Sequence, residues 1–433
     1  MTSGVRSPRL GRLALALAII GAVGVIYDHA VFSSFFHDDF HWLAQTRRFE
    51  AANLFRLDRY DHFYRPVIEL YFLAGLNAFG CNPFPFHITS LTIHLLCTLV
   101  LFLFARALTA SEAFATLTAV FFAVQPGYVQ AVTWIGAITD LLPALWYLSA
   151  LWLYLRYVQS RQTRDYAAAL AAFTLCLLTH ESAATLLPMI LALELTVSDG
   201  GPRTRIAALA RHSARYAPFA ALLAGFLAIA WIVNTRSYLV REGHYALGWH
   251  AIPNALDYVV SLYVGKHIVP SYLAIAAVTI ATLIKGSPLG RFFIVWIFVT
   301  LAPASFFTWG NASRYLYLPA AGFAMLLAHA VLAAHRMARE RWGSRIATPA
   351  ALAVAAAMAI RFAAFASDGA DGFREETRPY ERLIATIERS GQQHAPGDRI
   401  VVAAADLYGV PELYRDGVAE TVACRPGVRL VIE

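Results

Sequence analysis

The sequence predicts an all-α polytopic membrane protein with a small α/β appendage at its C-terminal end. Of the 433 residues, 58% are hydrophobic and 15% are charged, whereas a surface that faces water needs about a quarter of its residues charged. The apolar residues gather in long runs, such as 114–132 and 350–360. Lipid therefore covers most of the folded chain, and a soluble protein is excluded.

Eleven apolar segments are long enough to be spans, because a helix that crosses a bilayer needs about 20 mainly apolar residues. The fifth and sixth are short and divide one run, 166–197, at His180 and Glu181, because this run is too long for a single span. The first begins like a signal peptide, but its long apolar stretch and the lack of a cleavage motif predict that it is retained. The predicted spans are 10–34, 86–105, 113–131, 141–157, 166–180, 182–197, 216–233, 267–284, 292–308, 315–335 and 346–366.

Arginine clusters predict the orientation, because short cytoplasmic loops collect Lys and Arg. They precede the first span and follow the fourth, sixth and tenth, so the N-terminus is expected in the cytoplasm and the C-terminus outside. Only Lys266 and Lys285 among the 35 basic residues are lysines. This preference for arginine over lysine is typical of a GC-rich bacterial genome and predicts a bacterial inner (plasma) membrane protein. It does not indicate a nucleic-acid-binding surface, despite the net charge of +7.

Two domains are expected, a membrane domain at 1–366 and an extracytoplasmic tail at 367–433. The membrane domain includes a large first outer loop, 37–85, in which the amphipathic stretch 66–80 is expected to lie along the membrane interface. The tail alternates helical and β-branched segments, in the order 380–389, 399–403, 411–422 and 428–432. With fewer than 70 residues, the tail has little core of its own and is expected to lean on the membrane domain.

Asp38 and Asp39 are adjacent carboxylates at the outer end of the first span. Charge near hydrocarbon costs several kcal/mol, so ionisable groups kept there usually have a function or a partner. Adjacent acids also move each other's pKa values apart, which suits a general base. The alternative is a solvated loop end in which an aspartate caps a helix.

Further ionisable residues stand at the outer ends of other spans. The planar guanidinium group of an arginine suits a phosphate or a carboxylate, although each basic side chain is equally suited to anchoring at the headgroups. An intramembrane Glu beside His is either a proton relay or a group that positions a substrate hydroxyl. His87 and His94 share a helix face, but spacing places no third ligand, so polar packing is favoured over a zinc site. The candidates are Arg65, Asp140, His180, Glu181, Lys266 and Arg314.

Five motifs in order carry a family resemblance, which covers residues 10–334. Together they resemble the GT-C glycosyltransferases, and are most similar to the membrane half of the tetratricopeptide-repeat transmembrane O-mannosyltransferases and their bacterial relatives. The motifs are Asp38-Asp39, Tyr64-Arg65-Pro66 with the Phe79-Gly80-Cys81-Asn82-Pro83 run, Gln125-Pro126-Gly127-Tyr128 with Asp140, Thr179-His180-Glu181, and Ser313-Arg314-Tyr315-Leu316-Tyr317.

The resemblance implies a polyprenyl-phosphate-linked sugar as donor and an aspartate of the first outer loop as catalytic base. By position this base is Asp38, Asp39 stands where relatives often have a second acid, and Arg314 matches the arginine of the Arg-Tyr-Leu-Tyr motif. Two departures matter: His180 stands where relatives commonly have Lys, and the short tail replaces their repeats. The acceptor is therefore left open between a glycan, a lipid and a protein.

By analogy with inverting glycoside chemistry, the base takes the acceptor proton while cations stabilise the leaving phosphate. Arg314 is expected to be the leading cation, with Arg65 and Lys266 behind it. No cofactor is certain from the sequence, and a divalent metal is possible.

An ion-coupled transporter or a lipid flippase is the alternative, with His180, Glu181 and Asp140 as its proton sites. Carriers typically show internal repeats with paired broken helices, and the sequence shows no such symmetry. Cys81 and Cys424 are both expected outside, where a bond between them is possible in an oxidising compartment, although the sequence does not reveal cysteine partners.

Overall fold

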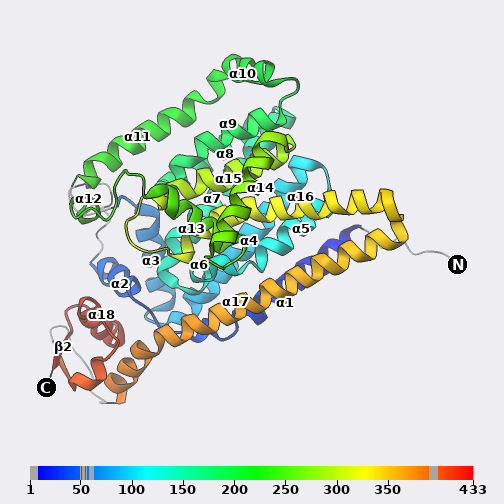
Figure 1. Cartoon of the computed structure of the whole chain (residues 1–433). Helices are drawn as coiled ribbons and strands as arrows, with labels where there is room; N and C mark the ends of the chain where they lie inside the picture. The colour runs from blue at the N-terminus through cyan, green and yellow to red at the C-terminus, as the bar shows by residue number, and fades with distance from the viewer. Residues whose placement is uncertain are drawn as a thin grey trace.

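The computed structural model describes residues 8–48, 50, 54, 56–57, 63–235, 237–389 and 398–432, and helices predominate in them (Figure 1). This architecture confirms the predicted all-α polytopic fold with a small α/β appendage. The helices are α1 (Pro8–Ile26), α2 (Asp38–Arg47), α3 (Pro66–Phe79), α4 (Pro83–Thr109), α5 (Glu112–Ala123), α6 (Val129–Thr133), α7 (Ile138–Ser160), α8 (Thr163–Leu177), α9 (Leu186–Val197), α10 (Pro202–Arg211), α11 (Ala217–Asn234), α12 (Tyr238–Arg241), α13 (Ala251–Tyr263), α14 (Val269–Lys285), α15 (Pro288–Ser305), α16 (Tyr317–Trp342), α17 (Ser344–Arg389) and α18 (Glu412–Ala423). The strands β1 (Arg399–Val402) and β2 (Arg429–Ile432) pair in parallel.

Each of the eleven predicted spans coincides with a helix. Within the described residues, six helices are long and apolar enough to cross a membrane, or seven if the bent pair formed by Glu112–Ala123 and Pro126–Thr133 is one span. This pair is bent by 45° at Pro126, because proline has no N–H to continue the helical hydrogen bonds. The short fifth and sixth predictions correspond to α8 and α9, with 15 and 12 residues.

Aromatic side chains fill the centre of the bundle, where α4, α5, α7, α15 and α16 pack together. Trp296 is fully buried, and its indole N–H donates to the carbonyl of Leu318 over 2.9 Å. The ring of His94 lies 2.8 Å from the Tyr317 hydroxyl and 3.2 Å from the carbonyl of Ala123. Trp296 and His94 thus find polar partners inside the protein, as a membrane interior favours, and this geometry agrees with the polar packing predicted for His94.

The arginine clusters and the candidate site residues lie at opposite ends of the same helices. Asp140 is in the first turn of α7, whereas Arg156 is in its last two turns. Likewise Arg314 precedes α16, whereas Arg339 and Arg341 are in its last turn. With 23 and 26 residues, these helices are roughly 35–39 Å long, which exceeds the hydrocarbon thickness of about 30 Å.

The tail is joined to the bundle by α17 and docks on the first loop. This helix has 46 residues, lies along α1, and carries the chain to α18 at the far end of the molecule (Figure 1). It continues without a break across residue 366, the expected domain boundary. Of the expected first outer loop, residues 49, 51–53, 55 and 58–62 lie outside the described part of the chain. A disulfide joins Cys81 to Cys424, with the two Cα atoms 5.8 Å apart.

Gly322 on α16 tests how closely α15 and α16 pack. A Cβ atom at this position would lie 2.6 Å from Cδ1 of the buried Trp296. We expect Gly322→Ala to lower the free energy of unfolding by about 1–3 kcal/mol, because the packed core cannot absorb the added methyl group. The melting temperature in detergent measures this loss.

Gly225→Ala on α11 is the matched control, because nothing lies within 4 Å of a Cβ built there. Alanine favours a helix over glycine by roughly 0.5–1 kcal/mol, so this variant should melt no lower than wild type. Equal melting temperatures for Gly322→Ala and wild type would contradict the close packing of α15 on α16.

Candidate active site

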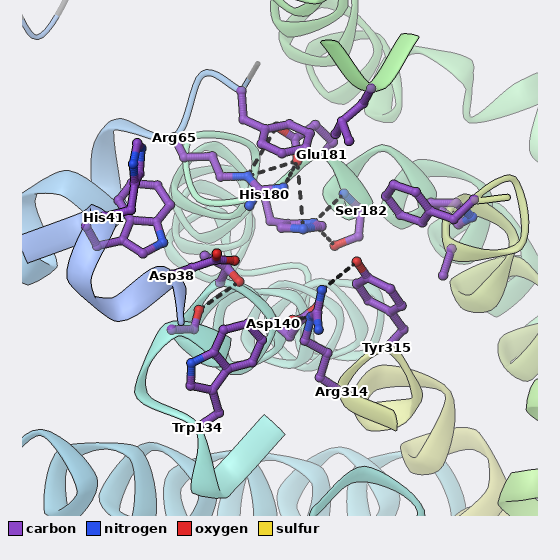
Figure 2. Close-up of a pocket in the computed structure, with 18 of the residues that line it drawn as sticks. Asp38, His41, Arg65, Trp134, Asp140, His180, Glu181, Ser182, Arg314 and Tyr315 are labelled. Atoms are coloured by element: carbon purple, nitrogen blue, oxygen red, sulfur yellow. Dashed lines mark hydrogen bonds and ion pairs between the residues drawn. The ribbon is translucent and has the colours of Figure 1, made fainter. Parts of the chain in front are cut away.

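A cavity of about 730 Å³ lies at the end of the bundle that carries the predicted site residues. Its lining comes from α2, the start of α3, the start of α7, the turn at Glu181–Thr185 and the turn at Ser313–Leu316, among other segments. Asp39 and Lys266 are not among the lining residues. The other six predicted site residues are brought together there (Figure 2): Asp38, Arg65, Asp140, His180, Glu181 and Arg314.

Arg65 and Glu181 form a tight ion pair in the cavity wall. Arg65 directly precedes α3 and is 8% exposed. Its Nη2 and Nε atoms donate to Oε2 of Glu181 over 2.7 and 3.1 Å. Burial opposes ionisation of Glu181, but the charge and hydrogen bonds of Arg65 hold the pKa of Glu181 below its usual value. The carboxylate is therefore charged, and the positive charge of Arg65 is largely neutralised.

Arg314 forms a looser pair with Asp140. Its Nε atom lies 3.5 Å from Oδ2 of Asp140, and its Nη2 atom donates to the hydroxyl of Tyr315 over 2.9 Å. The guanidinium carbon stands 5.0 Å from the ring centre of Trp134. A guanidinium group has five N–H donors, so Arg314 keeps donors for an anion in the cavity.

His180 lies beside the Arg65–Glu181 pair. Its Nδ1 atom accepts the backbone N–H of Ser182 over 3.0 Å, which leaves the ring proton of the neutral form on Nε2. This Nε2 atom lies 3.8 Å from Oε2 of Glu181. His180 therefore offers the cavity a neutral donor beside the Arg65–Glu181 pair.

Asp38 and Asp39 begin α2 but lie in different surroundings, because successive helical residues are rotated by about 100°. Asp38 is exposed to the cavity and accepts a hydrogen bond of 2.8 Å from the hydroxyl of Tyr414. Asp39 is 1% exposed, and its Oδ2 atom accepts the backbone N–H of Phe36 over 2.8 Å. Burial raises the pKa of Asp39 well above its usual value. Asp39 holds the turn before α2 and does not line the cavity.

Glu69 and Tyr414 are two of the polar cavity residues that the sequence analysis missed. Glu69 is 2% exposed in the first turn of α3, where Gln45 donates to it over 3.2 Å. The sequence did contain a signal for Glu69, because it is an acid inside an otherwise apolar segment that follows Tyr64-Arg65-Pro66. Tyr414 comes from α18, 376 positions along the chain from Asp38, so no local pattern could have paired the two.

The cavity therefore combines a proton acceptor with two guanidinium groups. In the described part of the chain, no three His, Cys, Asp or Glu residues stand close enough together to hold a metal ion. None of the steps of the proposed transfer uses a metal ion. The ionisable side chains lining the cavity are Asp38, Glu69, Asp140, Glu181, Arg65, Arg314, His41, His180, Tyr245, Tyr315, Tyr317 and Tyr414.

Sequence comparisons match part of the chain to protein O-mannosyltransferases. The family model for dolichyl-phosphate-mannose-protein mannosyltransferase matches residues 65–231. The mouse protein O-mannosyl-transferase TMTC1 is 30% identical over 170 residues, which cover 35% of this chain and 18% of the relative. The human TMTC1 is 29% identical over 151 residues, or 31% of this chain and 17% of the relative. The chain thus covers less than a fifth of the length of these relatives.

Solved structures of membrane glycosyltransferases share the fold over almost the whole chain. ArnT from Cupriavidus metallidurans superposes with a TM-score of 0.60 at 13% identity, covering 99% of this chain and 87% of ArnT. The Archaeoglobus fulgidus oligosaccharyltransferase gives a TM-score of 0.56 at 15% identity, covering 98% of this chain and 64% of that enzyme. The fold is therefore that of the GT-C class, and the resemblance found in the five motifs is confirmed.

Asp39→Asn tests the separation of the two acids. Because the folded state raises the pKa of Asp39, its carboxyl group favours folding when protonated, and this contribution is lost as pH rises from about 4 through the raised value. Asparagine does not titrate, so the variant should become more stable than wild type as pH rises from about 4 to 7, by about 1.4 kcal/mol per unit of raised pKa. Melting temperatures across this pH range measure the difference.

Sugar transfer by Asp39→Asn should stay close to wild type, because Asp39 does not line the cavity. A variant that loses stability relative to wild type as pH rises, or that loses all transfer while still folded, would contradict the structural role of Asp39.

Proposed function

We propose that the protein is a membrane glycosyltransferase that moves a sugar from a polyprenyl-phosphate donor to an acceptor at the extracytoplasmic face. The observation that carries this proposal is the cavity in which Asp38 lies together with Arg314 and Arg65. A fold of the GT-C class and the partial match to O-mannosyltransferases support it. The acceptor is a glycan, a lipid or a protein.

A lipid-linked donor is supported by the names of the similar proteins. The matching family model is named for dolichyl-phosphate mannose, and ArnT has been solved with undecaprenyl phosphate bound, in a structure that superposes with a TM-score of 0.57 at 12% identity. Both molecules join a polyprenyl chain to a phosphate. We infer the same donor chemistry here, because the cavity lies at a membrane boundary and holds two arginines.

The proposed transfer inverts the anomeric carbon. The acceptor hydroxyl attacks from the side opposite the phosphate, so the bond from the acceptor oxygen forms as the bond to the phosphate oxygen breaks. The acceptor proton passes to the Asp38 carboxylate, and the electron pair of the broken bond leaves with the polyprenyl phosphate. The departing phosphate needs no proton, so positioned cations replace an acid partner.

Arg314 is better placed than Arg65 to stabilise this phosphate. Its contact with Asp140 is 3.5 Å long, against 2.7 Å between Arg65 and Glu181. Coulomb attraction falls with distance, so the shorter Arg65–Glu181 pair, with two donors on one carboxylate, is harder to separate than the Arg314–Asp140 pair. Arg65 with Glu181 then serves as a fixed wall, and Lys266, which lies outside the lining, receives no role.

We infer that the cavity faces the extracytoplasmic side, with the N-terminus in the cytoplasm and the C-terminus outside. The arginine clusters at the opposite helix ends support this orientation. The Cys81–Cys424 disulfide supports it independently, because such bonds persist in oxidising compartments. The scarcity of lysine favours the plasma membrane of a bacterium.

The transporter alternative is less well supported. It needs Glu181 to take up and release a proton, but this residue is paired with Arg65 over 2.7 Å. The neighbouring cation favours the charged carboxylate and so opposes proton uptake. A fixed pair of this kind suits a binding site more than a proton pathway.

Asp38→Asn tests the base. We expect transfer from radiolabelled undecaprenyl-phosphate mannose to membrane-extract acceptors to fall by about 10²–10⁴-fold, which is the usual contribution of a general base. The variant should fold normally, because Asp38 is exposed to the cavity. Asp368→Asn, an exposed acid on α17 outside the cavity lining, is the control. If purified, folded Asp38→Asn transfers sugar at the wild-type rate, the assignment fails.

Arg314→Lys and Arg314→Ala test the leaving-group cation. Removing one donor to a developing negative charge typically costs about 10²–10³ in rate, so Arg314→Ala should lose that much kcat/KM. Arg314→Lys should recover part of it, since lysine keeps the charge without the planar fork. The rate of polyprenyl phosphate release measures both, with Arg361→Lys on α17 as a control outside the cavity lining. Wild-type kcat/KM in Arg314→Ala would exclude Arg314 from phosphate stabilisation.

A further inference from the structure

Helix α18 of the tail forms part of the cavity wall. Leu413, Tyr414 and Gly417 of this helix line the cavity together with Asp38 and Phe40 of α2, and α18 packs along α2. The tail therefore supplies part of the cavity wall and is not a separate appendage.

Tyr414 contacts both Asp38 and the residue before it. Its hydroxyl donates to Oδ1 of Asp38 over 2.8 Å. Its ring stacks on the imidazole of His37, with centroids 5.1 Å apart and planes 15° apart, while Phe36 stacks on His37 at 3.8 Å. His37 has a φ of 46°, which is a strained backbone conformation for a residue other than glycine. The two rings thus hold a strained backbone directly before Asp38.

A covalent bond and two ion pairs fix α18 in this position. Cys424, which directly follows α18, is bonded to Cys81. The side chain of Glu420 is 6% exposed and lies 3.1 Å from Nη2 of Arg48 and 3.7 Å from Nη1 of Arg47. Both arginines belong to the end of α2, so the helix that begins with Asp38 is held to the helix that carries Tyr414.

Gly417 shows how closely the two helices approach. A Cβ atom there would lie 2.7 Å from Cβ of Phe40, which is attached to the backbone and cannot swing away. The approach of α18 to α2 thus depends on a residue without a side chain. Such fixed placement matters for catalysis, because a displacement of about 1 Å at a reacting group can cost about 10²-fold in rate.

We propose that Tyr414 is a positioning residue for Asp38, and that the docked tail is required to complete the catalytic cavity. The hydroxyl of Tyr414 holds the carboxylate that takes the acceptor proton, and α18 carries this hydroxyl to α2. This inference rests on the proposed function, because it needs Asp38 to act as the base.

Tyr414→Phe tests the proposal, because it removes the hydroxyl and keeps the ring that stacks on His37. We expect kcat with undecaprenyl-phosphate mannose to fall by about 10- to 100-fold, as for a lost hydrogen bond to a charged group. KM for this donor should stay near wild type, because the Tyr414 hydroxyl contacts Asp38 and not the arginines proposed to hold the phosphate. Tyr408→Phe is the matched control, since Tyr408 lies on the same tail, is 81% exposed and does not line this cavity.

A raised KM with unchanged kcat overturns the proposal, because a contact to the base acts on the chemical step and not on donor binding. Paired Cys81→Ser and Cys424→Ser substitutions provide a second test with Tyr414 intact. Releasing the tail should lower kcat and leave KM for the donor near wild type. Adding Tyr414→Phe to the cysteine variant should lower kcat by less than the product of the two separate fold-losses, because both changes act through one contact. A combined loss equal to that product overturns the proposal.

Asp38→Asn separates the two possible failures. If this variant keeps wild-type transfer, the proposed function fails and the role of Tyr414 fails with it. If Asp38→Asn abolishes transfer while Tyr414→Phe matches wild type in kcat and KM, only the positioning role is wrong.

Discussion

The ion pair between Arg65 and Glu181 is the interaction on which the site depends. It joins the residue before α3 to the turn between α8 and α9, and the backbone N–H of Val67 adds a hydrogen bond of 3.2 Å to the carbonyl of Leu178. Arg65 is 8% exposed, so loss of Glu181 would leave its charge without a partner in a largely buried position. The pair therefore pins the start of α3 against the bundle, and α3 in turn packs against α2, the helix that begins with Asp38. The looser Arg314–Asp140 pair can then respond to a ligand.

The two adjacent aspartates at the start of α2 point in different directions and so have different surroundings. Asp39 is buried under α2, where it orders the turn around Phe36, while Asp38 is left open to the cavity. Environment decides which carboxyl holds a proton and which stays available for chemistry. In the proposed mechanism only Asp38 contacts the substrate, and the structural role of Asp39 accounts for the second aspartate.

Much of the fold could be predicted, because hydrocarbon thickness dictates a length of apolar sequence and helices satisfy their own backbone. All eleven apolar segments became helices for that reason. Six candidate residues met in one cavity because alternating spans bring every second helix end to the same side. The direction of Asp39 was not predictable, since it depends on the residue at which α2 begins. Tyr414 was not predictable either, because its contact with Asp38 is set by the course of α17 and by a disulfide whose partners no spacing reveals.

The disulfide links positions 343 residues apart, so nearly the entire bundle is enclosed between its two cysteines. Cys424 leaves the ribosome 343 residues after Cys81. The wall that α18 supplies is therefore missing while the helices between the two cysteines are inserted into the membrane. Until α18 is made, Asp38 lacks its contact with the Tyr414 hydroxyl, and the cavity lacks the side formed by Leu413, Tyr414 and Gly417.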